Sequence, residues 1–309
     1  MSEAMSGRVA CVGGSVAALS LAREHNPHLS TAHCDQAAAG GDKATASPSK
    51  QFKVRAAVEQ KVCASAEKVL RSFNTWAFKR EQPSDPQLML QVIAAAIAAQ
   101  HPIQFALYWG KGPRHEVAAP DAQCLDFLTS LSSRVRSAYE PGAAIKLILT
   151  DTHAELNGHS RHDINKYFDD INTAAKQRGF ETCMLSQLVN AAGNLATLAP
   201  LDDVVSADTV AQLVVSAKKW YRGSATPQEG AMTYLRMNLI EQRVVEREFP
   251  HSIFITFNGS NLRRLFPQQL PIFYMYSLRR GMCVKPWFLP AQSTTFGLSV
   301  DQPHPRRPN

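Results

Sequence analysis

Between residues 51 and 277, segments with apolar residues at helical spacing alternate with short, continuous apolar runs. Segments with apolar residues at helical spacing, which predict amphipathic helices, are Gln51–Lys79, Leu88–Gln100, Ala122–Tyr139, Asp163–Arg178, Ala207–Tyr221 and Glu229–Arg247. Short apolar runs, which predict buried strands, are Ile103–Trp109, Ala144–Thr150, Phe180–Leu185, Ile253–Phe257 and Ile272–Ser277. Alternating strands and helices are typical of parallel sheets. The pattern therefore predicts an α/β fold, with a Rossmann-like, mostly parallel sheet flanked by helices in a single main domain.

Both ends of the chain differ in composition from this middle part. Ala37–Lys50 is rich in Ala, Gly, Ser and Lys, which is typical of a linker. From Pro290 onward the chain is polar and rich in proline. We therefore predict a flexible or poorly ordered extension over residues 1–50, the α/β domain over 51–290 and a disordered tail over 291–309.

One part of the extension leaves two interpretations open. Gly7–Glu24 has the pattern of a strand, a glycine turn and a helix, and Asp35 follows about twenty residues after the turn, which is the spacing of a dinucleotide-binding motif. The spaced glycines of that motif are incomplete here. Residues 1–50 either bind a nucleotide or form a loosely packed segment.

Charge and cysteine content narrow the class of protein. The chain has a formal net charge of +7 and six scattered Cys without metal-ligand spacing. Because the basic residues are dispersed and not interleaved with aromatic residues, an anionic small substrate explains them as well as nucleic acid does. Widely spaced Cys indicate reduced thiols, and no apolar run is long enough to span a membrane. We expect a cytoplasmic protein that binds small molecules, not nucleic acid or membrane.

The first candidate site follows the first predicted strand. It comprises Tyr108, Trp109, Gly110, Lys111, Gly112 and Arg114. The two glycines allow a ligand to approach the backbone closely, and the two cations beside free backbone N–H groups favour a phosphate or carboxylate. The alternative is an ordinary tight turn with solvated basic residues.

The second candidate site follows the next predicted strand, and its members are Asp151 and His153. Asp151 is a candidate to orient a ligand amine, or to hold His153 in one tautomer so that the imidazole acts as a base. The alternative is that Asp151 caps the next turn and His153 is exposed. His159 and His162 lie in the same predicted loop, but the spacing matches no standard metal template, so no metal is predicted.

A third basic cluster near the last strands includes Asn258, Arg263 and Arg279, and binds either a second anion or only solvent. The motifs of common hydrolases and kinases, such as GxSxG, HExxH and the P-loop, do not occur in the sequence.

The order of motifs over residues 88–290 resembles the isocyanide (isonitrile) synthase family, which includes pyoverdine/dityrosine-type biosynthesis enzymes. The quoted motifs are Pro102–Phe105, Lys111-x-Pro113, Pro120-Asp121, Tyr139-x-Pro141-Gly142-Ala143, Asp151, His153, Gly158-x-Ser160 before Asp163 and Tyr167, Phe249-Pro250 and Pro286-Trp287. The sequence departs from the family at several turns: Arg114 replaces an Asn, Thr152 replaces a Gly, and Phe288 follows the late Pro-Trp where a His is common. The late strand, Phe254–Asn258, also lacks the family's Arg and His.

The resemblance implies a reaction of specialised metabolism in which an amino-acid amine condenses with ribulose 5-phosphate, a transferase- or lyase-type chemistry with no metal or redox cofactor. It implies phosphate binding by Lys111 and Arg114 and amine chemistry at Asp151 and His153. Two alternatives stay open because of the departures. One is a related enzyme with a different reaction on an amino acid or sugar phosphate, and the other is a non-catalytic anion-binding protein of the same fold.

Overall fold

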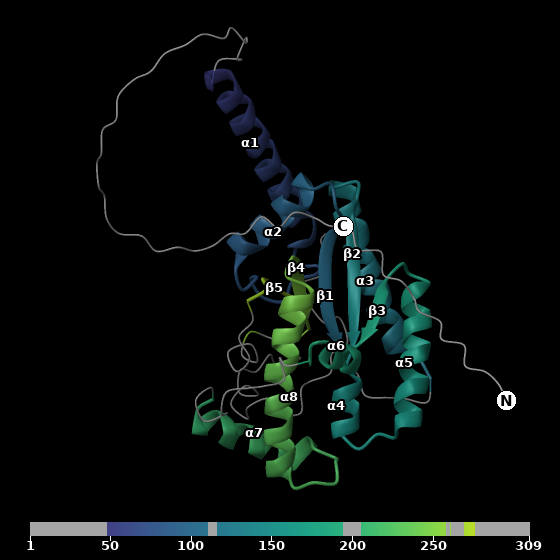
Figure 1. Ribbon diagram of the computed structural model, residues 1–309. Helices are drawn as coiled ribbons and strands as arrows, with labels where there is room; N and C mark the ends of the chain where they lie inside the picture. Colours follow the sequence, from purple (N-terminus) through teal and green to yellow (C-terminus); the bar gives the residue numbers. More distant parts are fainter. Residues whose placement is uncertain (1–47, 111–115, 194–204, 258–259, 261–268, 276–309) are drawn as a thin grey trace, which may run out of the picture. The chain divides into compact units, whose positions relative to one another are not determined.

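The computed structural model describes residues 48–110, 116–193, 205–257, 260 and 269–275 (Figure 1). The predicted extension, its possible nucleotide site and the predicted tail lie outside these residues, apart from Pro48–Lys50 at the start of the first helix. These predictions therefore stay predictions.

Five parallel strands form the single sheet of the described residues. They are β1 (Ile103–Trp109), β2 (Ala143–Leu149), β3 (Glu181–Met184), β4 (Ser252–Thr256) and β5 (Ile272–Tyr274). Their order in the sheet is β3-β2-β1-β4-β5, and all four pairings are parallel. The predicted Rossmann-like α/β fold is confirmed. The chain runs outward from β1 to β3 and then returns to β4 on the other side of β1, so the strand order reverses between β1 and β4.

Six helices occur where helical periodicity predicts them, within three residues at each end except at the end of the first. They are α1 (Pro48–Phe73), α2 (Pro86–Ala98), α3 (Ala119–Ala138), α5 (Arg161–Lys176), α7 (Ala207–Trp220) and α8 (Pro227–Glu248). Two further helices, α4 (Asp151–Leu156) and α6 (Leu185–Ala191), were not predicted. Both are too short to show a helical period. The predicted loop around His153 is therefore wrong, because Asp151 begins a helix there.

The first helix is shorter than its sequence pattern predicts. It ends at Phe73 and not at Lys79, and Lys79 instead forms an antiparallel bridge with Met275. Only the C-terminal part of the apolar stripe is in the core: Val69 and Phe73 are buried, whereas Val58 is 57% exposed.

Hydrogen-bonding side chains fix the starts of several helices. Ser160 caps α5 by accepting a hydrogen bond from the backbone N–H of Asp163, and Thr226 caps α8 in the same way. The helix α3 starts at Ala119, three residues before the predicted Ala122. Asp121 lies in its first turn, where its Oδ2 accepts a hydrogen bond from the backbone N–H of Ala118 at 3.0 Å.

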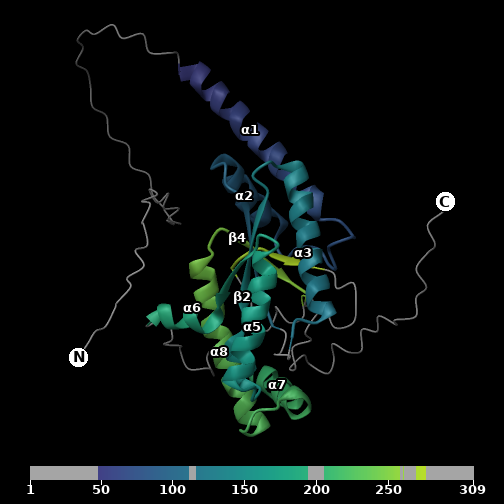
Figure 2. The same ribbon diagram turned by 90° about the vertical axis from the view of Figure 1, so that its right-hand side faces the viewer.

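The sheet is covered on both faces, which explains the apolar runs of its central strands. Phe105 and Leu107 of β1 belong to a core cluster built with α1, α2, α3 and α5. Ala106, the residue between them, belongs to a second cluster with side chains of α6 and α8. Figure 2 shows α3 and α6 on opposite sides of the strands. None of the described helices is long and apolar enough to cross a membrane.

Candidate functional site

The carboxyl ends of β1 and β2 lie side by side and are tied together. Trp109 pairs with Leu149 in the parallel register. The hydroxyl of Thr150 donates a hydrogen bond to the backbone carbonyl of Trp109 at 3.1 Å. In open parallel sheets, ligands bind beyond these strand ends near the point where the strand order reverses. Gly110 and Asp151, the residues that continue from the two strands, therefore stand at the expected place.

Asp151 is buried and strongly hydrogen-bonded. It is the first residue of α4, and its side chain is only 4% exposed. One carboxylate oxygen accepts a bond from the backbone N–H of Ser186 at 3.0 Å, and the other accepts a bond from the Ser186 hydroxyl. Nη1 of Arg161 lies 4.0 Å from the same carboxylate. Asp151 thus joins the end of β2 to the start of α6.

His153 is paired with a different carboxylate. Its Nε2 lies 2.7 Å from Oε2 of Glu241, which is buried on α8. The other carboxylate oxygen of Glu241 accepts a hydrogen bond from the Thr152 hydroxyl at 2.8 Å. The idea that Asp151 holds the imidazole is therefore replaced by a pairing with Glu241. The alternative of a fully exposed His153 is also wrong, since its side chain is only 20% exposed.

The aromatic ring of Tyr234 packs edge-on against the His153 imidazole, with the ring centroids 5.1 Å apart. Its hydroxyl donates a hydrogen bond to Oδ1 of Asn238, one turn further along α8. Tyr234, Asn238 and Glu241 are spaced at i, i+4 and i+7, which places them on one stripe of the helix. This stripe faces α4: Glu241 contacts Nε2 of His153, and Tyr234 packs against the imidazole ring.

The two aromatic residues at the end of β1 point to opposite faces of the sheet, as neighbouring strand residues do. Nε1 of Trp109 donates a hydrogen bond to the Tyr167 hydroxyl at 3.3 Å, which in turn lies 3.3 Å from Oδ1 of the fully buried Asp121. Tyr108 packs edge-on against Phe254 in the other core cluster, at 5.2 Å between ring centroids. Because they face opposite ways, Tyr108 and Trp109 do not line one pocket together.

The remaining predicted site residues lie outside the described residues: Lys111, Gly112, Arg114, Asn258, Arg263 and Arg279. Their roles stay predictions. Among the residues whose placement is described, no group of three or more His, Cys, Asp or Glu side chains is arranged to hold a metal ion.

Comparison with known proteins adds one structural finding. The sequence matches no protein-family model and no curated protein. The fold is similar to that of PvcA from Pseudomonas aeruginosa. The TM-score is 0.53 at 17% sequence identity, and the match covers 72% of this chain and 87% of PvcA. At this identity the likeness shows the fold alone, so the chain has a PvcA-like α/β fold.

Two other solved structures are less similar to this chain. A tyrosyl-tRNA synthetase from Pyrococcus horikoshii, in complex with L-tyrosine, matches with a TM-score of 0.39 and 12% identity over 62% of this chain and 49% of that chain. A Mycobacterium tuberculosis cyclodipeptide synthetase matches with a TM-score of 0.36 and 11% identity over 66% of this chain and 87% of that chain. At these scores neither likeness carries an argument beyond the PvcA comparison.

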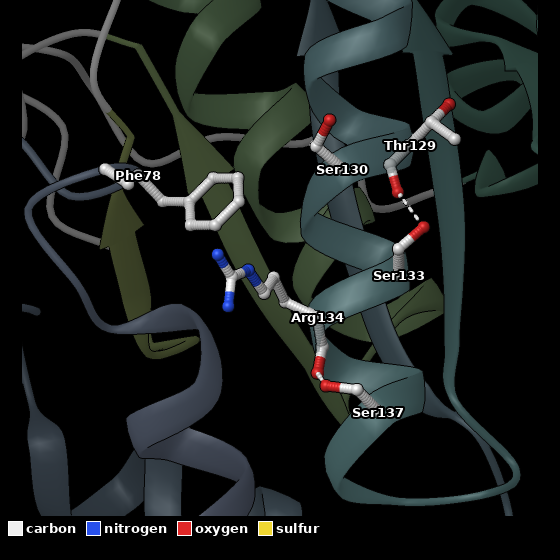
Figure 3. A pocket seen from close by; sticks show the side chains of 7 residues that line it. Phe78, Thr129, Ser130, Ser133, Arg134 and Ser137 are labelled. Atoms are coloured by element: carbon white, nitrogen blue, oxygen red, sulfur yellow. Dashed lines mark hydrogen bonds between the residues drawn. The ribbon is translucent and has the colours of Figure 1, made fainter.

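A surface pocket of about 510 Å³ lies elsewhere, between α3 and the segment after α1 (Figure 3). Its polar lining includes Ser130, Ser133 and Ser137, and each of these hydroxyls donates a hydrogen bond to a backbone carbonyl of α3. None of the residues that line it belongs to the carboxyl ends of β1 and β2 or to α4. In a PvcA-like fold the carboxyl edge, with His153 and Asp151, is the better candidate site.

Sequence reasoning missed Glu241, Ser186 and Tyr234, although one signal for Glu241 was present. Glu241 falls at helical spacing with the buried residues Tyr234, Val244 and Val245 of α8. A carboxylate on the apolar face of a helix requires a partner when buried. That partner, His153, lies 88 residues earlier, and no local pattern names it.

Proposed function

We propose that this chain is an isocyanide-synthase-like enzyme of specialised metabolism. It condenses the amine of an amino acid with a sugar phosphate such as ribulose 5-phosphate. The observation that carries the proposal is the place of His153: in a fold similar to that of PvcA, a buried carboxylate holds this imidazole at the carboxyl edge of the sheet. General acid–base groups at a ligand-binding edge are what such a condensation requires.

The chemistry assigns distinct tasks to the side chains. The amine nitrogen attacks the sugar carbonyl carbon, a carbon–nitrogen bond forms and the carbonyl oxygen leaves as water, which gives an imine. Both carbon–carbon bonds of the former carbonyl carbon must then break, so that this carbon alone stays on the nitrogen and the rest of the sugar phosphate is released as fragments. The ammonium must first lose a proton, for which His153 is the proposed base, and Asp151 is proposed to keep the amine in place. The prediction that Lys111 and Arg114 bind the phosphate completes the scheme. The substrates proposed are small molecules, and the scheme calls for no metal or redox cofactor.

The test is an incubation of the full-length protein with a pool of amino acids and ribulose 5-phosphate, followed by mass spectrometry. We expect a product that has gained one carbon and lost two hydrogens relative to one amino acid. Lys111→Ala and Asp151→Asn are expected to abolish its formation while the protein stays folded. In Asp151→Asn the amide still offers an acceptor to the Ser186 N–H, so folding is preserved.

A matched control is Asp126→Asn, which changes a carboxylate on α3 that is 64% exposed and paired with Arg178. This variant is expected to form product at the wild-type rate. Full activity of Lys111→Ala or Asp151→Asn would overturn the site assignment. Absence of any product from the folded wild-type protein would overturn the proposed reaction.

One observation favours a second candidate, a related enzyme with a different reaction on the same classes of substrate. The strand β4, Ser252–Thr256, is buried along its whole length and carries no charged side chain. The family resemblance leads one to expect an Arg and a His on this strand. If sugar phosphates raise the melting temperature of the protein but no carbon is transferred, this second candidate is favoured, because ligands that bind the native state stabilise it.

A further inference from the structure

Glu241 is a buried carboxylate, and both of its oxygens are engaged by one short helix. The residue is 2% exposed. Its partners, the Thr152 hydroxyl at 2.8 Å and His153 Nε2 at 2.7 Å, are neighbours on α4. Burying an ionised carboxylate without partners costs several kcal/mol, so the structure depends on both groups donating to it.

An ionised carboxylate only accepts hydrogen bonds, and this fixes the proton on the imidazole. The nitrogen that faces Glu241, Nε2, must carry a hydrogen. The second ring nitrogen, Nδ1, is then the one that gains and loses a proton. Among the described residues Nδ1 has no hydrogen-bond partner, and the side chain retains 20% exposure.

The ring is also held against rotation. Tyr234 packs edge-on against it at an interplanar angle of 70°. Tyr234 is itself oriented through its bond to Asn238 at 2.8 Å. The backbone carbonyl of His153 also accepts a hydrogen bond from the Asn157 side chain at 2.9 Å. The imidazole is therefore held with Nε2 as the donor to Glu241, and Nδ1 is left as the nitrogen that can accept a proton.

We propose that Glu241 is a positioning residue that locks His153 in the Nε2–H tautomer, so that Nδ1 is the atom that takes the proton from the substrate amine. This inference deepens the proposed function and rests on it for the identity of the amine. The lock itself is a property of the unliganded protein and is tested without substrate.

Other charged groups lie on α4 or pair with its side chains. Asp151 and Glu155 lie on α4 itself, and Arg161 of α5 is paired with both of these carboxylates. From α6 the nearest partner of this region is the uncharged Ser186, and from α8 the groups that face His153 are Glu241 and Tyr234. Asp151 and Glu155 thus share the cation Arg161, and Glu241 is the carboxylate in contact with the imidazole.

Nitrogen-15 NMR of the imidazole side chains measures the lock directly. The chain has 10 His, so the signals of His153 are assigned by their loss in His153→Asn. In the wild-type protein with a neutral imidazole we expect one protonated nitrogen, Nε2, with a slowly exchanging proton. Glu241→Leu removes the acceptor at similar volume, and we expect the two nitrogens of His153 to show exchange between both tautomers.

Two further variants keep this test decisive. Glu241→Gln retains an acceptor, so the Nε2 proton is expected to remain but to exchange faster; this holds even if Glu241→Leu fails to fold. Glu248→Leu, at an exposed Glu of the same helix, is expected to leave the His153 signals unchanged. A proton on Nδ1 in the wild type, or His153 signals in Glu241→Gln identical to those of the wild type, would overturn the proposal.

Turnover measurements separate this proposal from the proposed reaction. If the condensation is observed, Glu241→Gln is expected to lower kcat on the order of 100-fold with little change in KM, because the neutral amide stabilises the protonated imidazole less than the carboxylate does, while the binding groups are unchanged. An equal change in kcat and KM would argue for a purely structural role. If the wild type forms no product, the reaction is wrong, and the NMR result still decides the role of Glu241.

Discussion

Nε2 of His153 lies 2.7 Å from Oε2 of Glu241, although 88 residues separate the two along the chain. The contact joins α4, which continues from β2, to α8, which leads into β4. These two strands flank β1 on either side. The pair therefore spans the position at which the strand order reverses, where open α/β sheets bind their ligands.

Energetic coupling between His153 and Glu241 is the first expected consequence. His153→Ala removes one donor from a buried carboxylate and is expected to lower the free energy of unfolding by about 1–3 kcal/mol. Adding Glu241→Gln removes the unsatisfied charge, so the double variant is expected to lose less than the sum of the two single variants, with a coupling of about 0.5–3 kcal/mol. Urea denaturation of the four proteins measures this, and strictly additive losses would contradict the pairing.

The bond between Asp151 and Ser186 is expected to support the fold at the end of β2. Ser186→Ala removes the hydroxyl that donates to this buried carboxylate, and a hydrogen bond to a charged group contributes about 1.5–3 kcal/mol. The matched control is Ser130→Ala, because the exposed hydroxyl of Ser130 donates only to a carbonyl of its own helix. The free energy of unfolding of this variant is expected to change by no more than about 0.5 kcal/mol. Equal denaturation midpoints for the two variants would contradict this role.

Buried hydrogen bonds link Trp109 to Tyr167 and Tyr167 to Asp121. We therefore expect that removing the Tyr167 hydroxyl lowers the free energy of unfolding. Tyr167→Phe leaves the indole N–H and a fully buried carboxylate each without this partner, and we expect a loss of about 1–3 kcal/mol. Tyr139→Phe is the comparison. The side chain of Tyr139 is partly exposed, so when its hydroxyl is removed, water can take its place as the hydrogen-bond donor to the His101 carbonyl. Thermal unfolding followed by circular dichroism distinguishes them; a similar melting temperature for both would show that the buried bonds contribute little.

A substitution at Gly110 is expected to affect ligand binding but not the stability of the fold. A β-carbon at this position would meet the Thr150 hydroxyl at 3.8 Å, an ordinary contact, so Gly110→Ala is expected to fold with unchanged or slightly higher stability. If a ligand approaches the backbone here, the same variant is expected to raise the KM for the sugar phosphate severalfold. Gly142→Ala is the opposite control: with φ of 73° it is expected to be destabilised. Unchanged kinetics in Gly110→Ala would remove this residue from the binding site.

Cysteine reactivity provides a chemical check of the packing. Burial raises the pKa of the Cys183 thiol to about 11, with Lys146 lowering it and Glu181 raising it further. A raised pKa keeps the thiol protonated near neutral pH, and only the thiolate is nucleophilic. Alkylation at pH 8, followed by peptide mass spectrometry, is expected to modify the exposed Cys63 well before Cys183 and the buried Cys124. Cys183 is expected to react faster as the pH rises toward 11; rapid labelling of Cys183 at pH 8 would contradict this.

Periodicity was sufficient for most of the fold and failed where segments are short. The predicted strands at Ile103–Trp109 and Ala144–Thr150 agree with the structure within one residue, because buried parallel strands carry continuous apolar runs. The helices α4 and α6 have six and seven residues, which is less than the length over which a 3.6-residue period becomes visible. The largest error therefore fell at the candidate site itself.

The sequence alone determined the order of the strands and of the six longer helices, the α/β class, and the placement of Asp151 and His153 just after a central strand, since these follow from local hydrophobic patterns and turns. Tertiary structure decided which groups these side chains contact. It paired His153 with Glu241 and Asp151 with Ser186, and it buried Asp121 beneath Tyr167. These partners are 88, 35 and 46 residues apart along the chain. Contacts at such separation arise only when helices pack on the sheet, because a local pattern records that a polar residue is buried but not which distant group satisfies it.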